Sequence, residues 1–333
     1  MRSELEPHVV PRLRLMSSTR PATQQWPAGP RSAPVELPGL DGLSDPTSYL
    51  AHHSRSFRFA ASLMAKTHRA RLARVYAWCR YTDNLVDGEG SAELAERRLD
   101  HWLACSWDAY DGRDCGIELV NRVMGEMAGR EIPFGYAHDL VRAMRADLRF
   151  IPYSDLAALQ VYTYRAAGVV GRWLTELHGV RDPWMLERAT ALGQAMQLTN
   201  ILRDVGEDLE RGRMYLPVSA LEAYGLSFED VDAMRRGDRK VTASYRGLIE
   251  ELIAVAEADY ERAGQAVPKL PAEFRRAAAV ASAVYRGIHG AIRGNGYDNL
   301  RLRAYTSRSR KVILAATALV TLARFGGQVV SVE

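Results

Sequence analysis

The chain has 333 residues, which is enough for one large domain or two small ones. Hydrophobic residues make up 47% of it and charged residues 25%, so a sizeable core is available. The formal net charge of +4 fits an anionic ligand, but it also fits many proteins with no such partner. The three cysteines form no CxxC pair, which argues against a disulfide framework or a zinc site. We therefore expect a reducing compartment and a cytoplasmic protein.

Residues 1–45 differ from the rest of the chain. No helical periodicity survives their density of proline, so we predict a disordered Pro/Arg-rich tail and a folded domain over 46–333. The prolines are Pro7, Pro11, Pro21, Pro27, Pro30, Pro34 and Pro38.

From Thr47 onward, apolar residues recur at three- and four-residue spacing, which predicts helices nearly throughout. No alternating strand pattern flanked by hairpin turns is present, and no internal repeat indicates a solenoid. The predicted helices cover 47–66, 69–88, 91–110, 117–129, 134–150, 153–178, 184–210, 240–266, 271–294 and 300–324, with short helical pieces in a loop over 211–239. The sequence therefore predicts one all-α domain. Its longest apolar run, Val312 to Ala323, is about half a membrane span, so it predicts a core or interfacial helix.

The predicted helix 69–88 carries a pair of aspartates near its end. Arg80, Asp83 and Asp87 are spaced i, i+3, i+7 and share one helix face, and Gly88 is placed to end the helix. Two carboxylates one turn apart repel each other unless a cation lies between them. Mg²⁺ binds carboxylate oxygens and keeps waters that a phosphate can replace, and Arg80 is placed to contact the same phosphate.

The alternative for Asp83 and Asp87 is a solvated helix face. The same spacing occurs in Asp41 and Asp45, within the tail, where it supports nothing, so the spacing alone is weak. Apolar and aromatic neighbours favour a buried helix for the second pair, and buried acids need a partner. These neighbours are Leu72, Val75, Tyr76 and Val86.

The predicted helix 184–210 has a narrow polar stripe on an otherwise apolar surface. The stripe consists of Gln197, Asn200, Asp204 and Asp208, at i, i+3, i+7 and i+11. Side chains with oxygen donors suit Mg²⁺ and not zinc, whereas a solvated face usually mixes Lys and Glu. Gly206 costs this helix close to 1 kcal/mol relative to alanine, for which stability alone offers no reason. Two such helices can face each other across a bundle and form an apolar cavity with a carboxylate-lined mouth.

Four blocks of the chain together resemble the squalene/phytoene synthase family of head-to-head prenyltransferases, and the phytoene synthase form most. The resemblance covers the chain from about His53 to Thr306. The blocks are His53–Phe57, Trp78–Gly88, Tyr162–Gly171 and Gln197–Pro217. Asn84 replaces an acid that many members have, and Thr163 and Ala166 replace the usual Cys or Val, which puts the chain-length specificity in doubt.

The resemblance implies roles for individual residues and an isoprenoid-synthase-type helical bundle with a central apolar cavity. The implied ligands of Mg²⁺, or alternatively of Mn²⁺, are Asp83, Asp87, Asn200, Asp204 and Asp208. The implied catalytic residues are Asp83, Asp87, Asp204, Asp208, Arg80 and Tyr162. The implied substrate-binding residues are His53, Ser54, Ser56, Tyr76, Arg80, Gln197, Asn200, Arg203, Tyr285 and Arg303. For the tyrosines, ordinary core packing is the alternative.

The activity that the resemblance implies is condensation of two geranylgeranyl diphosphates to phytoene through a cyclopropyl diphosphate, as in carotenoid biosynthesis. A squalene, dehydrosqualene or presqualene diphosphate synthase using farnesyl diphosphate is the first alternative. A terpene cyclase and a basic nucleic-acid-binding protein are further alternatives. We expect a prenyl diphosphate as substrate, no nucleic acid partner and a monomer. Because the product is a lipid, a peripheral membrane association stays open.

Overall fold

The computed structural model describes residues 35–88 and 90–325 of the chain. In these ranges all regular structure is helical, as the sequence predicts, and no strand is present. The longer helices are α3 (Lys66–Asp87), α4 (Ala92–Tyr110), α5 (Glu118–Gly129), α6 (Gly135–Leu148), α9 (Pro183–Arg203), α13 (Ala243–Gly264), α14 (Ala272–Gly294) and α15 (Arg308–Phe325). The shorter ones are η1 (Leu40–Ser44), α1 (Pro46–His53), α2 (Arg55–Ala61), α7 (Leu156–Thr163), η2 (Tyr164–Gly168), α8 (Val169–Leu177), α10 (Val205–Glu210), α11 (Val218–Ala223), α12 (Phe228–Arg236) and η3 (Val267–Lys269).

The folded part of the chain begins earlier than the predicted boundary at residue 46. Residues 1–34 of the predicted tail lie outside the described residues. The remainder packs on the bundle, since Leu37 and Leu43 are buried and Tyr81 donates a hydrogen bond to the carbonyl of Pro38 at 2.8 Å. The sequence analysis assigned no function to Asp45. In the structure its side chain accepts hydrogen bonds from the first backbone amides of α1 and caps this helix.

The predicted helix 47–66 is interrupted at Ser54. This residue has an extended backbone, and its hydroxyl accepts a hydrogen bond from the amide of Phe57 at 3.1 Å, which makes it the N-cap of α2. The predicted helix 153–178 is also divided, because the turn η2 is π-helical and the amide of Val169 donates to the carbonyl of Tyr164. Such π-helical turns often occur at functional sites.

The predicted helix 184–210 breaks at Asp204, which joins α9 to α10. The buried Asn299 causes the break. Its side-chain amide donates a hydrogen bond to the main-chain carbonyl of Leu202, and its main-chain carbonyl accepts one from the amide of Gly206 at 3.2 Å. Insertion of a side chain into the helical ladder is a known cause of kinks. Gly206 also has the packing reason that the sequence lacked, because a Cβ there would lie 2.0 Å from the carbonyl oxygen of Leu300.

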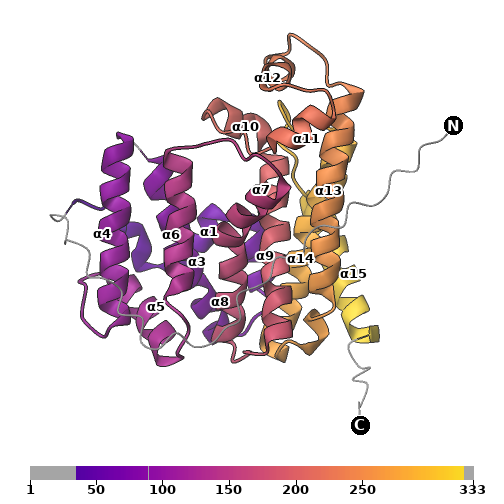
Figure 1. The fold of residues 1–333 in the computed structure, drawn as a ribbon. Helices are drawn as coiled ribbons and strands as arrows, with labels where there is room; N and C mark the ends of the chain where they lie inside the picture. The colour runs from indigo at the N-terminus through magenta and orange to yellow at the C-terminus, as the bar shows by residue number, and fades with distance from the viewer. Residues whose placement is uncertain (1–34, 89, 326–333) are drawn as a thin grey trace. The chain divides into compact units, whose positions relative to one another are not determined.

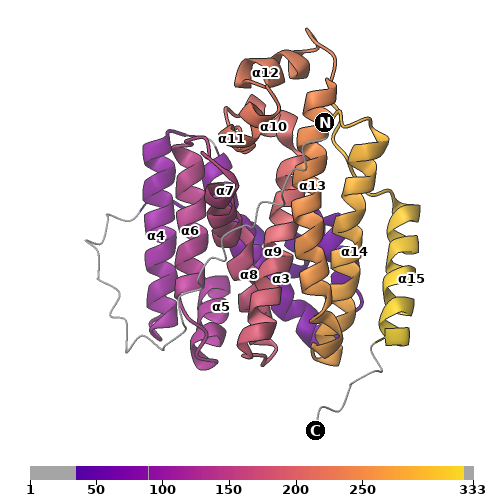
Figure 2. The ribbon, with the colours of Figure 1, turned by 45° about the vertical axis from the view of Figure 1, so that its right-hand side comes forward.

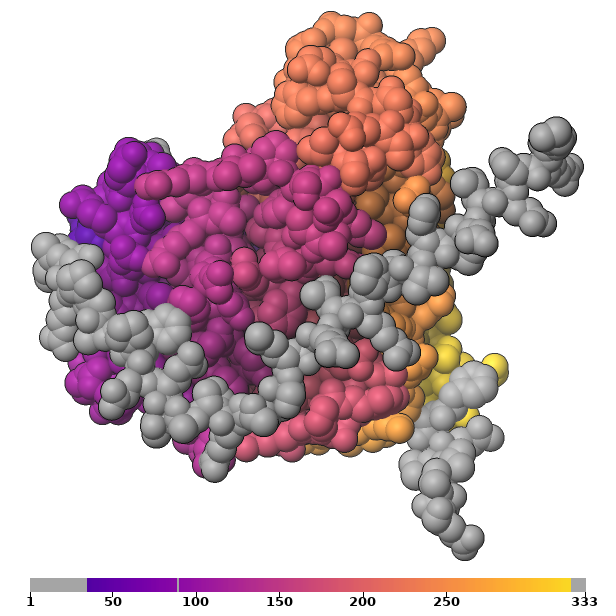
Figure 3. Space-filling view, in the orientation of Figure 1, coloured from indigo at the N-terminus to yellow at the C-terminus, as the bar shows by residue number. Residues whose placement is uncertain are grey.

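Helix α9 lies inside the bundle and packs against α8, α13 and α14. Helices α4 to α6 lie on one side of it and α13 to α15 on the other (Figure 1, Figure 2). The segment from α10 to α12 gathers at one end, where it projects at the top of the space-filling view (Figure 3). Among the described helices, none combines the length and the apolar character needed to cross a bilayer.

Candidate functional site

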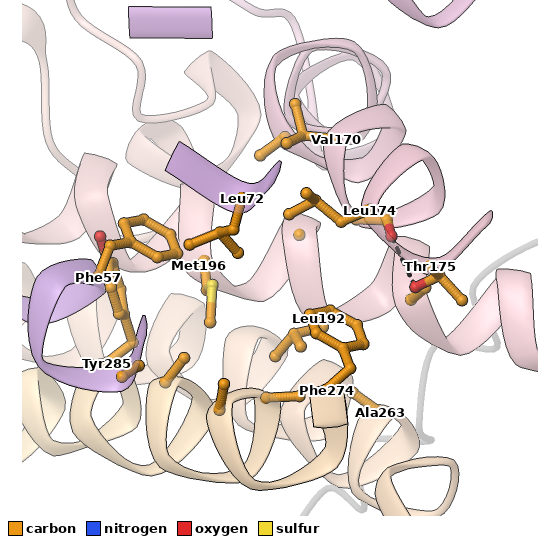
Figure 4. A pocket seen from close by; sticks show the side chains of 18 of the residues that line it. Phe57, Leu72, Val170, Leu174, Thr175, Leu192, Met196, Ala263, Phe274 and Tyr285 are labelled. Carbon is orange, nitrogen blue, oxygen red and sulfur yellow. Dashed lines mark hydrogen bonds between the residues drawn. The ribbon is translucent and has the colours of Figure 1, made fainter. Parts of the chain in front are cut away.

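An apolar cavity lies between α2, α3, α8, α9 and α14, as expected for the predicted bundle. It contains about 1330 Å³ of space free of atoms, counted with its open mouth. Leu72 of α3, Leu192 and Met196 of α9, and Phe274 of α14 are among the side chains that line it (Figure 4). Its lining on α9 runs from Met185 to Asn200, which is about 22 Å along a helix.

Two predicted substrate-binding tyrosines, Tyr76 and Tyr285, line this cavity. The ring of Phe57 lies between them, with its centroid 5.7 Å from Tyr76 and 5.3 Å from Tyr285. The Ser54 hydroxyl shares hydrogen bonds with both tyrosines, and burial raises the pKa of each phenol. The predicted substrate-binding residue Ser54 therefore joins the start of α2 to the wall of the cavity.

The first aspartate pair lies on the last two turns of α3, and Gly88 ends this helix as predicted. Arg80 donates to Asp83 in an ion pair that is half exposed. Burial raises the pKa of Asp83, with Arg80 acting in the opposite direction and Asp87 in the same one. The carboxylates therefore repel each other, and nearby cations stabilise them.

Two arginines from the loop after α10 pair with Asp87. Arg211 and Arg213 each donate to one of its carboxylate oxygens, at 3.1 and 3.0 Å. We call residues 211–217 the arginine loop. It connects the two aspartate motifs, which are far apart in the sequence, and supplies two guanidinium groups of the kind that bind phosphate in a bidentate manner.

The second aspartate pair lies where α9 meets α10. Asp204 accepts a hydrogen bond from Nε of the neighbouring Arg203 at 2.7 Å. It also accepts one from the guanidinium of Arg303 at 3.4 Å, and the Nε of Arg303 lies 3.1 Å from the same carboxylate in an ion pair. Arg303 also contacts Glu207 at 3.2 Å. Although burial disfavours its charge, the hydrogen bonds to Asp204 raise the pKa of Arg203. Arg303, a substrate-binding residue implied by the resemblance, thus reaches the second aspartate pair.

In two predicted metal ligands, side-chain oxygens accept no hydrogen bond from the described residues. The Asp208 carboxylate accepts no hydrogen bond from the described residues, and burial, together with the charge of Asp204, raises its pKa to about 7. The Oδ1 atom of Asn200 is buried without a hydrogen-bond partner. Buried polar oxygens in this condition fit a hard cation, which accepts oxygen donors and favours the ionised form of Asp208.

These residues are compatible with Mg²⁺ ions that are each held by two or three side chains together with a ligand's phosphate oxygens. Asp83 with Asp87, and Asn200 with Asp204 and Asp208, could each hold an ion. Within residues 35–88 and 90–325, no group of three or more His, Cys, Asp or Glu side chains is close enough to hold a metal by itself. A phosphate ligand would therefore have to complete the coordination.

Tyr162 is not among the residues that line the apolar cavity, unlike Tyr76 and Tyr285. Its hydroxyl donates to Asp147 at 2.9 Å and lies 3.4 Å from the hydroxyl of Tyr215. The sequence analysis missed Asp147 and Tyr215. A signal for Asp147 was present, because it continues the apolar face of α6 at the spacing of a core position.

The other predicted residues lie around the mouth. Gln197 and Asn200 line the cavity from α9. His53 lies at the end of α1 with much of its surface exposed, and partial desolvation of its ring together with the positive charge of Arg80 lowers its pKa. Ser56 is half-buried on α2. The fold thus brings together most of the predicted site, with Tyr162 set apart in the Asp147 contact.

Comparison with known proteins agrees with this geometry. Residues 50–310 match the family model described as squalene/phytoene synthase. The chain is 38% identical to a phytoene synthase of Thermus thermophilus over 276 residues, which cover 83% of this chain and 91% of the relative. It is 33% identical to the chloroplastic phytoene synthase 3 of Zea mays, and the match covers 86% of this chain and 68% of the relative.

Solved structures of similar proteins have the same fold. A dehydrosqualene synthase crystallised with a ligand has a TM-score of 0.75 at 28% identity, covering 86% of this chain and 98% of its own. A squalene synthase from Alicyclobacillus acidocaldarius has a TM-score of 0.69 at 25% identity, and the match covers 80% of this chain and 97% of that structure. The helical cavity, the two aspartate motifs at its mouth and these similarities lead to one conclusion: the chain belongs to the squalene/phytoene synthase family of head-to-head prenyltransferases.

Proposed function

We propose that this chain is a Mg²⁺-dependent phytoene synthase that condenses two geranylgeranyl diphosphates. The observation that carries the proposal is the position of the two aspartate motifs, with their arginines, beside the mouth of a long apolar cavity. Similarity to phytoene synthases at 33–38% identity favours this product over others. Bound Mg²⁺ would neutralise the diphosphate leaving group.

The chain's own residues bind and shield the substrates. Arg80, Arg203 and Arg213 can each turn from an aspartate to a phosphate oxygen, since all three already lie beside the proposed ligands. The apolar wall excludes water, which would otherwise quench an allylic cation. The rings of Tyr76 and Tyr285 border the mouth of this wall and can stabilise a cation by their π faces.

The second candidate is a farnesyl-using dehydrosqualene or squalene synthase. It is favoured by the similarity to solved dehydrosqualene and squalene synthase structures. Incubation of the purified chain with each prenyl diphosphate and Mg²⁺, followed by hydrocarbon analysis, separates the candidates. We expect a C40 triene from geranylgeranyl diphosphate, and a C30 product alone would contradict the phytoene assignment.

Alanine variants test the metal-binding part of the proposal. Asp83→Ala and Asp204→Ala should each abolish turnover while leaving the helical circular dichroism signal intact, because both residues are at the mouth and not in the core. Retained activity in either variant would refute its assignment as a metal ligand.

A peripheral contact with a membrane is part of the proposal. Val312, Ile313 and Val320 are at least half exposed on α15. No acid occurs between Asn299 and Phe325, so the exposed apolar side chains have only basic charged neighbours along the chain. Co-sedimentation with anionic lipid vesicles should be weaker for Ile313→Glu than for the unchanged chain. Equal binding would remove α15 from the contact. The expected monomeric state stays a prediction.

A further inference from the structure

A buried carboxylate on α6 has no part in the function proposed so far. Asp147 is 7% exposed and accepts hydrogen bonds from the hydroxyls of Tyr215 at 2.6 Å and Tyr162 at 2.9 Å. We call these three residues the Asp147 cluster. Hydrogen bonds to a charged acceptor are among the stronger ones in proteins, and a buried carboxylate depends on them.

The cluster joins three separate segments of the chain. Asp147 belongs to α6, Tyr162 to α7, and Tyr215 to the arginine loop. After Tyr215 the loop is also fixed to the α6–α7 connection, because the amide of Val218 donates to the carbonyl of Tyr153 at 2.9 Å. The cluster therefore anchors the loop on the side of the bundle that carries α6.

The arginine loop has a second attachment, which differs in kind. Two residues before Tyr215, Arg213 pairs with Asp87, and Arg211 pairs with the same carboxylate. These pairs lie at the mouth of the site, and they must loosen if Asp87 binds a metal and the arginines turn to a phosphate. Partly exposed ion pairs contribute little stability. The buried contact of Tyr215 with Asp147 is independent of that exchange.

We propose that Asp147 is a positioning residue, which through Tyr215 keeps Arg211 and Arg213 directed at the diphosphate site and with the same carboxylate orients the hydroxyl of Tyr162. The inference rests on the proposed function, because it takes a diphosphate as the ligand of the arginine loop. Asp147 is not a catalytic residue in this account, since among the described residues its carboxylate accepts hydrogen bonds from the two tyrosines and from no other side chain.

The cluster should respond to pH. The groups that face Asp147 are the phenols of Tyr162, Tyr215 and Tyr153, with the charges of Arg213, Asp83 and Asp208. Asp208 is present in the unchanged chain and in Asp147→Asn alike, so its own titration contributes to both pH profiles. Burial raises the pKa of Asp147 to about 6, although the tyrosine hydrogen bonds act in the opposite direction. Below this pH the carboxyl carries a proton and can no longer accept equally from both hydroxyls.

The sign of this effect separates positioning from stability. The pKa of Asp147 is higher in the folded chain than in the unfolded one, so the folded chain takes up this proton first as the pH falls. Protonation of Asp147 therefore does not destabilise the fold, while it loosens the anchor of the loop. Ligand affinity should fall between pH 7.5 and 5.5 without a matching fall in Tm from this group.

The test uses calorimetric binding of inorganic diphosphate with Mg²⁺ to the full chain, which does not depend on turnover. Asp147→Asn and Tyr215→Phe should each weaken binding on the order of tenfold. The double variant should bind diphosphate only slightly less tightly than the weaker-binding of the two single variants, because both substitutions disrupt the same contact between Tyr215 and Asp147. Asp139→Asn is the matched control, since Asp139 is a half-buried acid on the same helix. It forms an ion pair with Arg142 and lies near the charge of Arg165, and its replacement should leave binding unchanged.

The pH comparison adds a readout that a merely structural role would not change. The affinity of the unchanged chain should fall more steeply from pH 7.5 to 5.5 than that of Asp147→Asn. Diphosphate itself titrates in both measurements, so its contribution cancels when the two pH profiles are subtracted. If Asp147→Asn does not fold, Tyr215→Phe carries the test, because it removes a single hydroxyl. Unchanged binding in the folded variants overturns this inference alone. Absence of binding in the unchanged chain overturns the proposed function with it.

Discussion

The Asn200 side chain shows how a single residue can point to a ligand. Its Oδ1 is buried without a hydrogen-bond partner, whereas the amide of Gln194 on the same helix donates to the carbonyl of Gln160 at 3.1 Å. The sequence placed Asn200 on a stripe of oxygen donors, and only the structure revealed that its oxygen is unpaired. Helical spacing predicts which residues share one face of a helix, but it does not predict which of their side chains form hydrogen bonds within the protein.

Asn200→Ala should reduce turnover by about 10- to 100-fold and leave the melting temperature unchanged or slightly higher. The physical reason is that the substitution removes a candidate ligand but breaks no hydrogen bond of Oδ1. Steady-state rates over a range of Mg²⁺ concentrations and thermal denaturation measure the two effects. Gln194→Ala is the control, and an equal loss of activity in it would show that the effect is not specific to the metal site.

Cys115 is a second residue with an unusual environment. A hydrogen bond with the Cys105 thiol lowers the pKa of Cys115 to about 7, although burial opposes the shift. The same hydrogen bond and burial raise the pKa of Cys105, and burial raises that of Cys79. Because the thiolate is the reactive form, the three cysteines should differ in reactivity.

We expect iodoacetamide to alkylate Cys115 first, with a rate that reaches half its maximum near pH 7. Cys79 and Cys105 should react much more slowly over the same range. Mass spectrometry of tryptic peptides after timed labelling measures all three sites in one sample. Faster labelling of Cys105 than of Cys115 would contradict the statement that their hydrogen bond lowers the pKa of Cys115 and raises that of Cys105.

The helices show where sequence patterns are sufficient and where they fail. The end of α3 at Gly88 was predicted correctly, since an apolar period followed by a glycine is a local signal. The break between α9 and α10 was not predicted, because it depends on Asn299, which is about a hundred residues away along the chain. Helix propensity and periodicity contain no information about such a contact.

Close packing of α8 on α9 gives a prediction at this scale. A Cβ on Gly171 would lie 2.2 Å from the carbonyl oxygen of Ala189, so backbone must move to accept it. Gly171→Ala should therefore destabilise the fold by about 1–3 kcal/mol. Gly125→Ala on α5 is the matched control, since nothing lies within 4 Å of its Cβ, and it should stabilise by about 0.5–1 kcal/mol. Urea denaturation measures both, and a neutral Gly171→Ala would contradict the packing account.

At the scale of the whole molecule, the cavity is a product of several helices that no local pattern describes. Small side chains on α14, among them Ala277, Ala278 and Ala281, face the same space as Met185 and Leu192 of α9. Alanines in a predicted helix are ordinary helix formers, and the sequence does not distinguish those that face a cavity from those that face a neighbour. The fold decides which of them limit the length of a bound chain.

Ala277→Phe should shorten the prenyl chain that the cavity accepts. Ala277 lies about 12 Å before Tyr285 along α14, away from the mouth, so a phenyl ring there would fill the inner part of the cavity. We expect turnover of geranylgeranyl diphosphate to fall more than that of farnesyl diphosphate. Hydrocarbon analysis with each substrate measures this ratio. Ala272→Phe, at the exposed start of the same helix, is the control, and an equal change in both variants would argue against the inner position of Ala277.

The sequence by itself determined that the chain is helical, that two aspartate motifs lie on helices, and that its four blocks belong to a family. These are properties of spacing and residue type, which neighbours in the chain express directly. The tertiary structure decided that the arginine loop reaches Asp87, that Asp147 binds Tyr162 and Tyr215, and that Asn299 breaks the second aspartate helix. Each of these contacts joins residues distant in sequence, and their geometry depends on how whole helices pack.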